Sequence, residues 1–194
     1  DLRAGLWDYA AVEIFTVNWA DLTQGTLKQR KGRMGEVRAG RSTFMAELRG
    51  LAQNVQQVVG RLYGASCDAD LGDTRCAVAM GPFTVTGAIS TVTSNRIFTS
   101  AARVEATDYF TNGKFTFTSG SNNGLSMEIK TFAATLFTLQ LAMPYTVAVG
   151  NTYSVKAGCQ KRLSEDCKTK FNNVVNFRGF PYVPGIDQMQ SGGL

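Results

Sequence analysis

Short runs rich in β-branched and aromatic residues dominate the first third of the chain. Residues 10–19 (AAVEIFTVNW) have this composition, which is typical of a β-strand. Residues 31–50 follow the same pattern on both sides of Ala39 and Gly40. They predict a hairpin whose turn uses Gly40 at a positive φ.

A helical pattern interrupts the strands at residues 51–59. Apolar side chains recur there with the spacing of one helical face, and Gly60 follows as a stop signal. We expect a short helix with this face buried, formed by Leu51, Val55, Val58 and Val59.

The strand pattern returns in the second half of the chain. Runs of alternating residues are separated by turn signals such as TNG, SGSNNG and VGNTY, and they occupy residues 83–92, 114–119, 125–132 and 135–144. Evenly spaced short strands predict a small barrel or sandwich. The fold class is therefore mainly β, with two small β units and short helices.

We place the N-terminal β-rich unit at residues 1–66 and the C-terminal unit at residues 67–194. The last part of the chain (NFRGFPYVPGIDQMQSGGL) is punctuated by glycine and proline, which predicts an irregular cap or a contact arm. The candidate contact residues are Phe177, Phe180 and Tyr182, and the alternative is that these rings cover the chain's own barrel.

Composition excludes several classes of protein. With 194 residues, 44% of them hydrophobic, the chain can bury a core without covalent staples. It has no apolar run of roughly 18 residues, so we expect no membrane span. The absence of histidine removes Ser-His and Cys-His catalysis and every zinc site that uses histidine. A net charge of +5 permits an acidic partner but does not require one, and we expect no sequence-specific nucleic-acid binding.

Four cysteines are the strongest chemical signal. Cys67 and Cys76 enclose eight residues, and Cys159 and Cys167 enclose seven. Two disulfides, structural zinc, an iron–sulfur cluster and free thiols all remain open on spacing alone. Zinc is disfavoured because both gaps are wider than a zinc knuckle, whereas the spacing of cluster ligands varies more.

The residues around the cysteines favour an anionic group. Several cations adjoin the pairs, namely Arg75, Lys161, Arg162 and Lys168. The run SEDC predicts a helix that Ser164 caps, with Cys167 near its positive end, where the thiolate is favoured. We expect turn capping from Asp68, Asp70 and Asp73, with calcium binding a lesser option.

The segments LYGASCDADLGDTRCAV and AGCQKRLSEDCKTKFNNVVNFRGFPYVPG resemble the tail hub proteins of long-tailed phages and gene transfer agents. Residues 16–53 are similar to the same family, and residues 167–185 carry the most specific match. Family members usually have a further N-terminal portion, and the start at Asp1 rather than Met suggests a processed or truncated terminus.

The resemblance implies a structural virion protein at the distal end of the tail. Its partners would be the distal tail ring, the central tip or fibre protein and two further hub copies in a homotrimer. It also implies a [4Fe–4S] cluster held by Cys67, Cys76, Cys159 and Cys167, which would staple the C-terminal unit.

Two other classes of protein remain. A cell-wall hydrolase would need an acid/base pair, and Glu13, Glu36 or Glu47 could be nominated, but each lies on an expected strand with charged neighbours. We therefore expect no enzyme. The alternative function is a secreted β binding module that two disulfides stabilise.

Overall fold

The computed structural model describes residues 5–40, 43–50, 52–56 and 60–183. The chain divides into two compact units, Asp1–Gly60 (unit 1) and Arg61–Leu194 (unit 2). No helix within these described ranges is long and apolar enough to cross a membrane.

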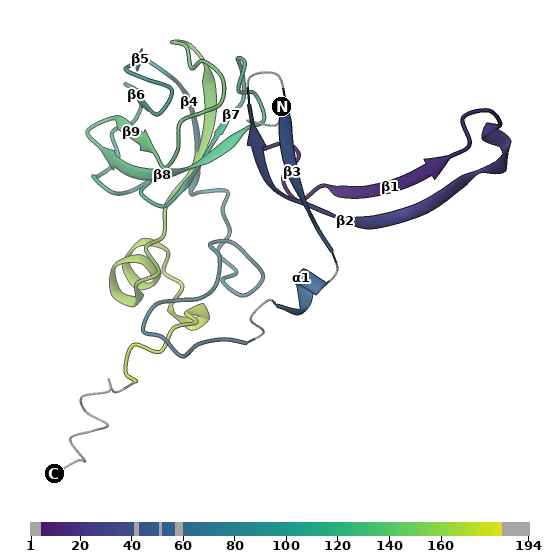
Figure 1. Cartoon of the computed structure of the whole chain (residues 1–194). Coiled ribbons are helices and arrows are strands. Elements are labelled where there is room, and N and C mark those ends of the chain that lie inside the picture. The colour runs from purple at the N-terminus through teal and green to yellow at the C-terminus, as the bar shows by residue number, and fades with distance from the viewer. Residues whose placement is uncertain (1–4, 41–42, 51, 57–59, 184–194) are drawn as a thin grey trace. The chain divides into compact units, whose positions relative to one another are not determined.

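Unit 1 is a three-stranded antiparallel sheet in the order β1-β2-β3 (Figure 1). Its strands are β1 (Ala11–Val17), β2 (Thr26–Ala39) and β3 (Phe44–Arg49). The 3₁₀ helix η2 (Leu22–Gln24) joins β1 to β2, and Asp21 caps it by accepting a hydrogen bond from the Thr23 amide at 3.0 Å. These strands confirm the expectation for residues 10–19 and 31–50, although β2 begins earlier, at Thr26.

Two local predictions in unit 1 were wrong. Gly40 does not have a positive φ. Its backbone amide donates a hydrogen bond to the Thr43 carbonyl at 2.8 Å, between β2 and β3. The helix α1 covers only Ala52–Val55, and Val55 is 86% exposed, so the expected buried face is not formed there. Leu51, Val58 and Val59 lie outside the described residues.

Unit 2 contains a seven-stranded antiparallel sheet in the order β4-β10-β7-β8-β9-β6-β5. Its strands are β4 (Thr84–Ala88), β5 (Thr91–Val92), β6 (Ile97–Thr99), β7 (Lys114–Phe117), β8 (Ser126–Ala133), β9 (Leu136–Leu139) and β10 (Thr152–Lys156). The four predicted runs coincide with β7, β8, β9 and, as one run instead of two strands, β4 with β5, whereas β6 and β10 were not predicted. The failure to predict β10 matters most, because this strand lies between β4 and β7 and pairs with both of them.

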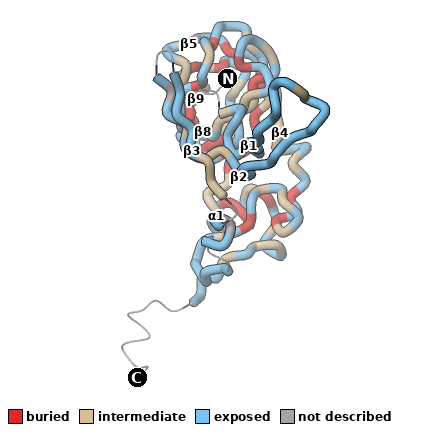
Figure 2. Tube along the Cα trace, turned by 45° about the vertical axis from the view of Figure 1, so that its right-hand side comes forward, coloured by how far each residue is buried: buried red, intermediate tan, exposed pale blue. Residues whose placement is uncertain are grey.

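The sheet curls around an aromatic core. A register irregularity between Ile129 and Thr131 bends β8, which pairs with β7 before this point and with β9 after it. Seven rings of the core are fully buried, namely Phe98, Phe110, Phe115, Phe117, Phe132, Phe137 and Tyr153. The curled single sheet thus forms a half-barrel around this core, and Figure 2 marks the buried positions along its trace.

The loops of unit 2 form a second, smaller core. Its buried members are Ala69, Cys76, Val78, Ala157 and Phe171. These residues come from the loops that enter and leave the sheet, so this core ties the two ends of the β unit together. Phe171 directly follows the π-helix η3 (Leu163–Lys170), and the 3₁₀ helix η4 (Val174–Asn176) comes next.

Candidate functional site

The two cysteine segments lie side by side at one end of the unit 2 sheet (Figure 1). The Cys67 amide donates a hydrogen bond to the Lys161 carbonyl at 2.9 Å. In return, the Lys161 ammonium donates to the Ala69 carbonyl. Sequence positions about 90 residues apart are therefore joined in both directions, as the expected site requires.

Asp73 organises the first segment. Its Oδ1 accepts from the Cys76 amide at 2.6 Å and from the Arg75 amide at 2.9 Å, and its Oδ2 accepts from the Asp70 amide at 3.1 Å. These bonds, above all the one from Cys76, lower the pKa of Asp73. The expected turn capping is confirmed for Asp73, while Asp68 forms ion pairs with Arg75 and Arg61.

The second segment contains the expected helix in a different form. It is a π-helix with Arg162 at its N-cap, so Ser164 lies inside it and makes no cap. Asp166 caps the helix instead, because its Oδ2 accepts hydrogen bonds from both the backbone amide and the Nε of Arg162 at 3.1 Å. The wider i→i−5 spacing is seen in the bond from the Cys167 amide to the Arg162 carbonyl.

The helix terminus does not lower the pKa of Cys167, contrary to the prediction. Burial is the largest effect and raises this pKa to about 11, with further increases from Cys67, Cys159, Cys76 and Asp166. The pKa of Cys159 is also raised, mainly by burial. Three of the four cysteines, Cys67, Cys76 and Cys159, lie in or against the second, smaller core.

Most of the expected cations are paired with acids instead of facing the sulfurs. Arg75 pairs with Asp68, and Arg162 pairs with Asp166 at 3.1 Å. Lys170, which the sequence analysis did not select, is half-buried. Its ammonium donates to the carbonyls of Tyr109 at 2.5 Å and Gly158 at 2.8 Å.

Lys170 is therefore a cation embedded beside the second cysteine segment. Its ammonium also lies 4.3 Å from the centre of the Tyr109 ring, and burial lowers its pKa. Its position three residues after Cys167 is the only signal in the sequence that could have identified it.

Two N–H donors reach the sulfurs. The Lys161 amide donates to Cys159 Sγ at 3.4 Å, and Asn173 Nδ2 lies 3.8 Å from Cys76 Sγ while donating to the Cys76 carbonyl at 2.5 Å. The Asn173 amide also donates to the Cys167 carbonyl at 2.7 Å. Asn173 therefore links a cysteine of the first pair to a cysteine of the second, a role that no sequence pattern revealed.

All four cysteines are free thiols. Across the described ranges, no three or more Cys, Asp or Glu side chains lie close enough together to hold one metal ion. This arrangement gives no support to a single zinc or calcium ion. A pocket of about 290 Å³ opens beside Cys159, so the site has a route to solvent.

The aromatic residues that follow η4 are largely exposed to solvent. Tyr182 is 88% exposed and Phe180 is 44% exposed. Phe180 packs edge-on against Tyr63, with ring centres 4.7 Å apart, instead of against the barrel core. A pocket of about 500 Å³ is lined by Phe177, Phe180 and Tyr182 together with neighbouring apolar residues.

Unit 1 lacks a hydrophobic core within its described residues. Gly32 is the one residue buried there, and the large apolar side chains of the strands and the connecting turn are exposed. They include Ile14, Phe15, Trp19, Leu22, Leu27, Phe44 and Met45. The nominated carboxylates are also accounted for, since Glu13, Glu36 and Glu47 each pair with a cation.

Known protein families match parts of both units. Residues 1–79 match the family model described as baseplate hub protein, N-terminal attachment domain, and residues 108–187 match phage conserved hypothetical protein BR0599. No curated protein matches the chain. A solved structure described as the virion of a native gene transfer agent particle contains a chain 34% identical to this one. Its TM-score is 0.84, and the match covers 100% of this chain and 68% of that chain.

This chain belongs to the tail hub family of long-tailed phages and gene transfer agents. The hub chain is thus a structural protein of a virion tail or baseplate, as its sequence predicted. The matches to the two family models lie on different parts of the hub chain, one covering all of unit 1 and the other lying within unit 2.

Proposed function

We propose that this hub chain joins the distal tail ring to the central tip or fibre protein at the distal end of the tail. Three copies would surround the tail axis and repeat the same contacts. The observation that carries this proposal is the unit 1 sheet, whose large apolar side chains are exposed among the residues that the structure describes. The matching family model is described as an attachment domain, which supports the same role.

The energetic reason is that a three-stranded sheet without a core gains little from folding alone. Phe15, Trp19 and Phe44 are 53%, 89% and 59% exposed. Burying side chains of this size contributes roughly 1.5–3 kcal/mol each. Several such residues together offset a large part of the cost of association, which is about 4–15 kcal/mol.

A catalytic role has no support in the carboxylates. Ion pairs with Lys28 and Arg49 lower the pKa values of Glu13 and Glu47. A general acid needs a raised pKa, so neither residue is suited to donating a proton near neutral pH. We infer that the hub chain is not an enzyme.

We also propose that Cys67, Cys76, Cys159 and Cys167 hold a [4Fe–4S] cluster. The fit rests on four free thiols, a hydrogen bond between their two segments, a backbone N–H donor at Cys159 and the embedded cation of Lys170. A four-iron cluster is wider than one ion, so its ligands need not meet the spacing that a single metal demands. When bound, the cluster would supply a cross-link between the segments that enter and leave the sheet.

The alternative, a secreted module with two disulfides, has less support. All four thiols are free in the structure. Besides burial, the three other cysteines all raise the pKa of Cys167, whereas an isolated pair would involve one of them. Membership of the hub family also favours a virion protein.

Metal analysis of anaerobically purified protein tests the cluster. We expect iron and acid-labile sulfide in about equal amounts, near four of each per chain. Stoichiometric zinc without iron would refute the cluster and leave the hub role intact. Cryo-EM of tails should show three copies at the distal end, and six copies or none would refute the proposed assembly.

A double-mutant cycle tests whether the four thiols act as one site. Cys67→Ser should destabilise the protein nearly as much as Cys67→Ser and Cys167→Ser together, because losing one ligand weakens the whole cluster. Thermal melting and tail assembly provide the readouts. Additive losses, with single mutants still assembling tails, would favour independent disulfides.

A further inference from the structure

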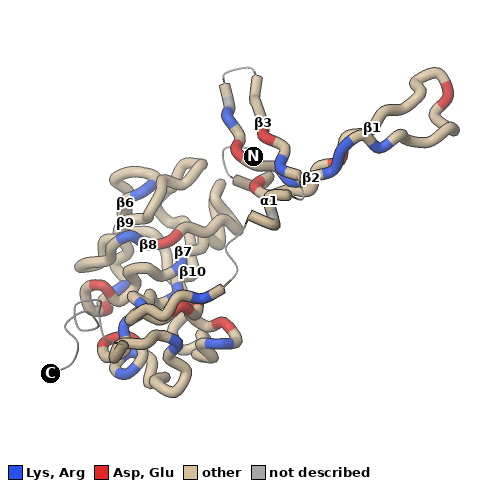
Figure 3. Tube along the Cα trace, turned by 60° about the horizontal axis from the view of Figure 1, so that its bottom comes forward, with Lys and Arg blue, Asp and Glu red and all other residues tan. Residues whose placement is uncertain are grey.

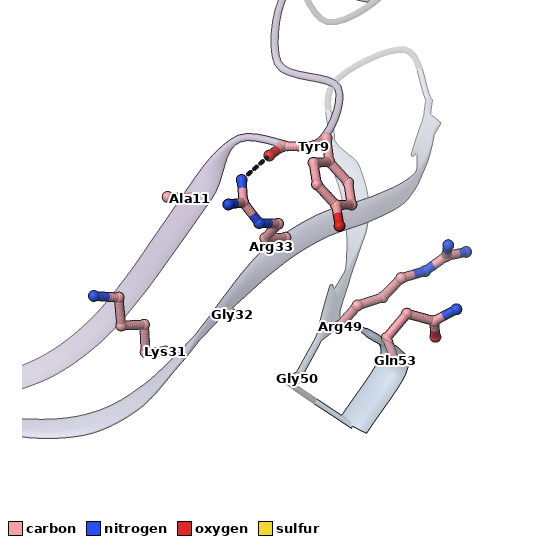
Figure 4. A pocket seen from close by; sticks show the side chains of 8 residues that line it. All are labelled: Tyr9, Ala11, Lys31, Gly32, Arg33, Arg49, Gly50 and Gln53. Carbon is pink, nitrogen blue, oxygen red and sulfur yellow. Dashed lines mark hydrogen bonds between the residues drawn. The ribbon is translucent and has the colours of Figure 1, made fainter. Parts of the chain in front are cut away.

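A pocket within unit 1 collects cations and contains no carboxylate (Figure 4). Its volume is about 270 Å³, and it lies where β2 and β3 meet the start of α1. The charged side chains of its lining are Lys31, Arg33 and Arg49. Lys and Arg residues recur along β2 (Figure 3). Those inside the pocket and those outside it differ in their ion pairs.

Two arginines are paired in register across the strands of this pocket. Arg33 of β2 is the direct register partner of Arg49 of β3. Residues directly opposite in an antiparallel pair project to the same face, and like charges in that position destabilise the sheet. An anion bound in the pocket would offset this repulsion.

The carboxylates of the sheet do not neutralise every cation of the pocket. Lys28 and Arg38, outside the pocket, pair with Glu13 and Glu36 at 2.9 and 3.1 Å. Arg49 Nε pairs with Glu47 at 2.9 Å. Lys31 is the direct register partner of Glu13, whose pKa is lowered mainly by Lys28 and further by Lys31. Among the residues that the structure describes, no carboxylate lies within 4.0 Å of the charged group of Arg33, so Arg33 is the cation on which the proposed site depends.

Arg33 is held in place although it forms no salt bridge with any carboxylate in the described part of the chain. Its guanidinium lies 4.6 Å from the centre of the Tyr9 ring, and its Nη1 donates to the Tyr9 carbonyl at 3.2 Å. Stacking and this single bond fix the plane of the guanidinium while leaving other N–H groups for a ligand. A fixed guanidinium plane suits a carboxylate, which it can bind through two parallel hydrogen bonds.

Glycines shape the strand beneath these side chains. A Cβ at Gly32 would lie 2.5 Å from the Arg49 carbonyl oxygen, and one at Gly35 would lie 2.6 Å from Arg49 Nε. Any other residue at either position would therefore displace Arg49. The backbone of β2 permits the close approach on which the pocket depends.

We propose that this pocket binds a carboxylate-bearing segment of a neighbouring virion protein. The pocket lies at the small end of ligand sites, which are about 300–1,000 Å³, so it suits one or two acidic side chains. The exposed apolar residues of the same unit, such as Trp7 and Phe44, suit a protein partner better than a nucleic acid, whose interfaces are more polar. The inference rests on the proposed hub function for the source of the partner.

Binding of a labelled hexaglutamate peptide to the full chain tests the proposal. Fluorescence anisotropy at low salt would compare it with hexaglutamine and with a 12-nucleotide single-stranded DNA carrying the same label. Arg33→Gln should weaken hexaglutamate binding about tenfold or more, the effect of losing a charged hydrogen-bonded pair. Arg38→Gln is the matched control, since it removes the same charge from β2 outside the pocket, and it should change binding less than about twofold.

The other outcomes each overturn the proposal. Equal losses in Arg33→Gln and Arg38→Gln would show that only net charge matters. Tighter, Arg33-dependent binding of DNA would assign the pocket to nucleic acid, and no binding of hexaglutamate by the wild type would remove the site. Arg33→Lys keeps the charge but not the planar donor pair, so wild-type affinity in this variant would also contradict the proposal; we expect weak binding with an unchanged melting temperature.

Tail copurification separates this inference from the hub function. Wild-type protein that joins tails but ignores hexaglutamate would refute the pocket alone. Protein that binds hexaglutamate through Arg33 but never joins tails would refute the hub role and leave the carboxylate site in place.

Discussion

Asn173→Leu should weaken the connection between the two cysteine segments. Asn173 Nδ2 donates to the Cys76 carbonyl at 2.5 Å, and its Oδ1 accepts from Asn176 Nδ2 at 2.7 Å. Leucine has a similar size but can make neither bond. Because Cys76 is buried, its carbonyl would lose this donor in a site with little access to water.

The magnitude follows from these two bonds. A neutral intramolecular hydrogen bond contributes about 1 kcal/mol net, so the pair contributes about 2 kcal/mol. In a chain of this size, 1 kcal/mol corresponds to a shift of roughly 2–4 °C in Tm, so we expect a loss of about 4–8 °C. Asn173→Asp should also destabilise the site, because it replaces the donor to Cys76 with a charged acceptor.

Differential scanning fluorimetry and iron analysis of anaerobically purified protein would measure both effects. Asn123→Leu is the control, since Asn123 is an exposed asparagine in a turn of the same unit, and it should cost less than about 0.5 kcal/mol. If Asn173→Leu melted within 1 °C of wild type and retained its iron, Asn173 would not connect the segments, and our account of the site would be refuted.

Three further predictions test other parts of the structure. Phe137→Ala should cost about 3–5 kcal/mol, measured by urea unfolding, because this fully buried ring touches five others, whereas Phe15→Ala in unit 1 should leave the unfolding of unit 2 unchanged. The metal-free protein should lose stability as pH rises from about 9 through about 11, since the raised pKa of Cys167 favours its neutral form in the folded state; stability that is flat across this range would contradict the buried thiol. Phe180→Ser with Tyr182→Ser should reduce tail incorporation while moving Tm little, because Tyr182 is 88% exposed; a large loss of Tm with normal assembly would identify the rings as part of the chain's own packing.

The sequence by itself determined the mainly β class and the resemblance to tail hub proteins. Both depend on local information, since strand alternation and turn residues act over a few neighbours. The same local information identified the cysteine pairs and showed that no histidine was available for catalysis. It also anticipated the capping role of Asp73, because a side chain that caps a turn acts within its own loop.

The tertiary structure decided which distant residues meet. It selected a π-helix where the sequence indicated an ordinary helix start at Ser164, and it raised the pKa of Cys167 because burial and three neighbouring thiols outweigh the helix terminus. Lys170 and Asn173 entered the site through contacts with backbone groups that lie up to 97 residues away. In unit 1, strand register placed Arg33 opposite Arg49. Such contacts depend on strand pairing and loop packing between distant segments, and a local pattern of residue types contains no information about which segments will become neighbours.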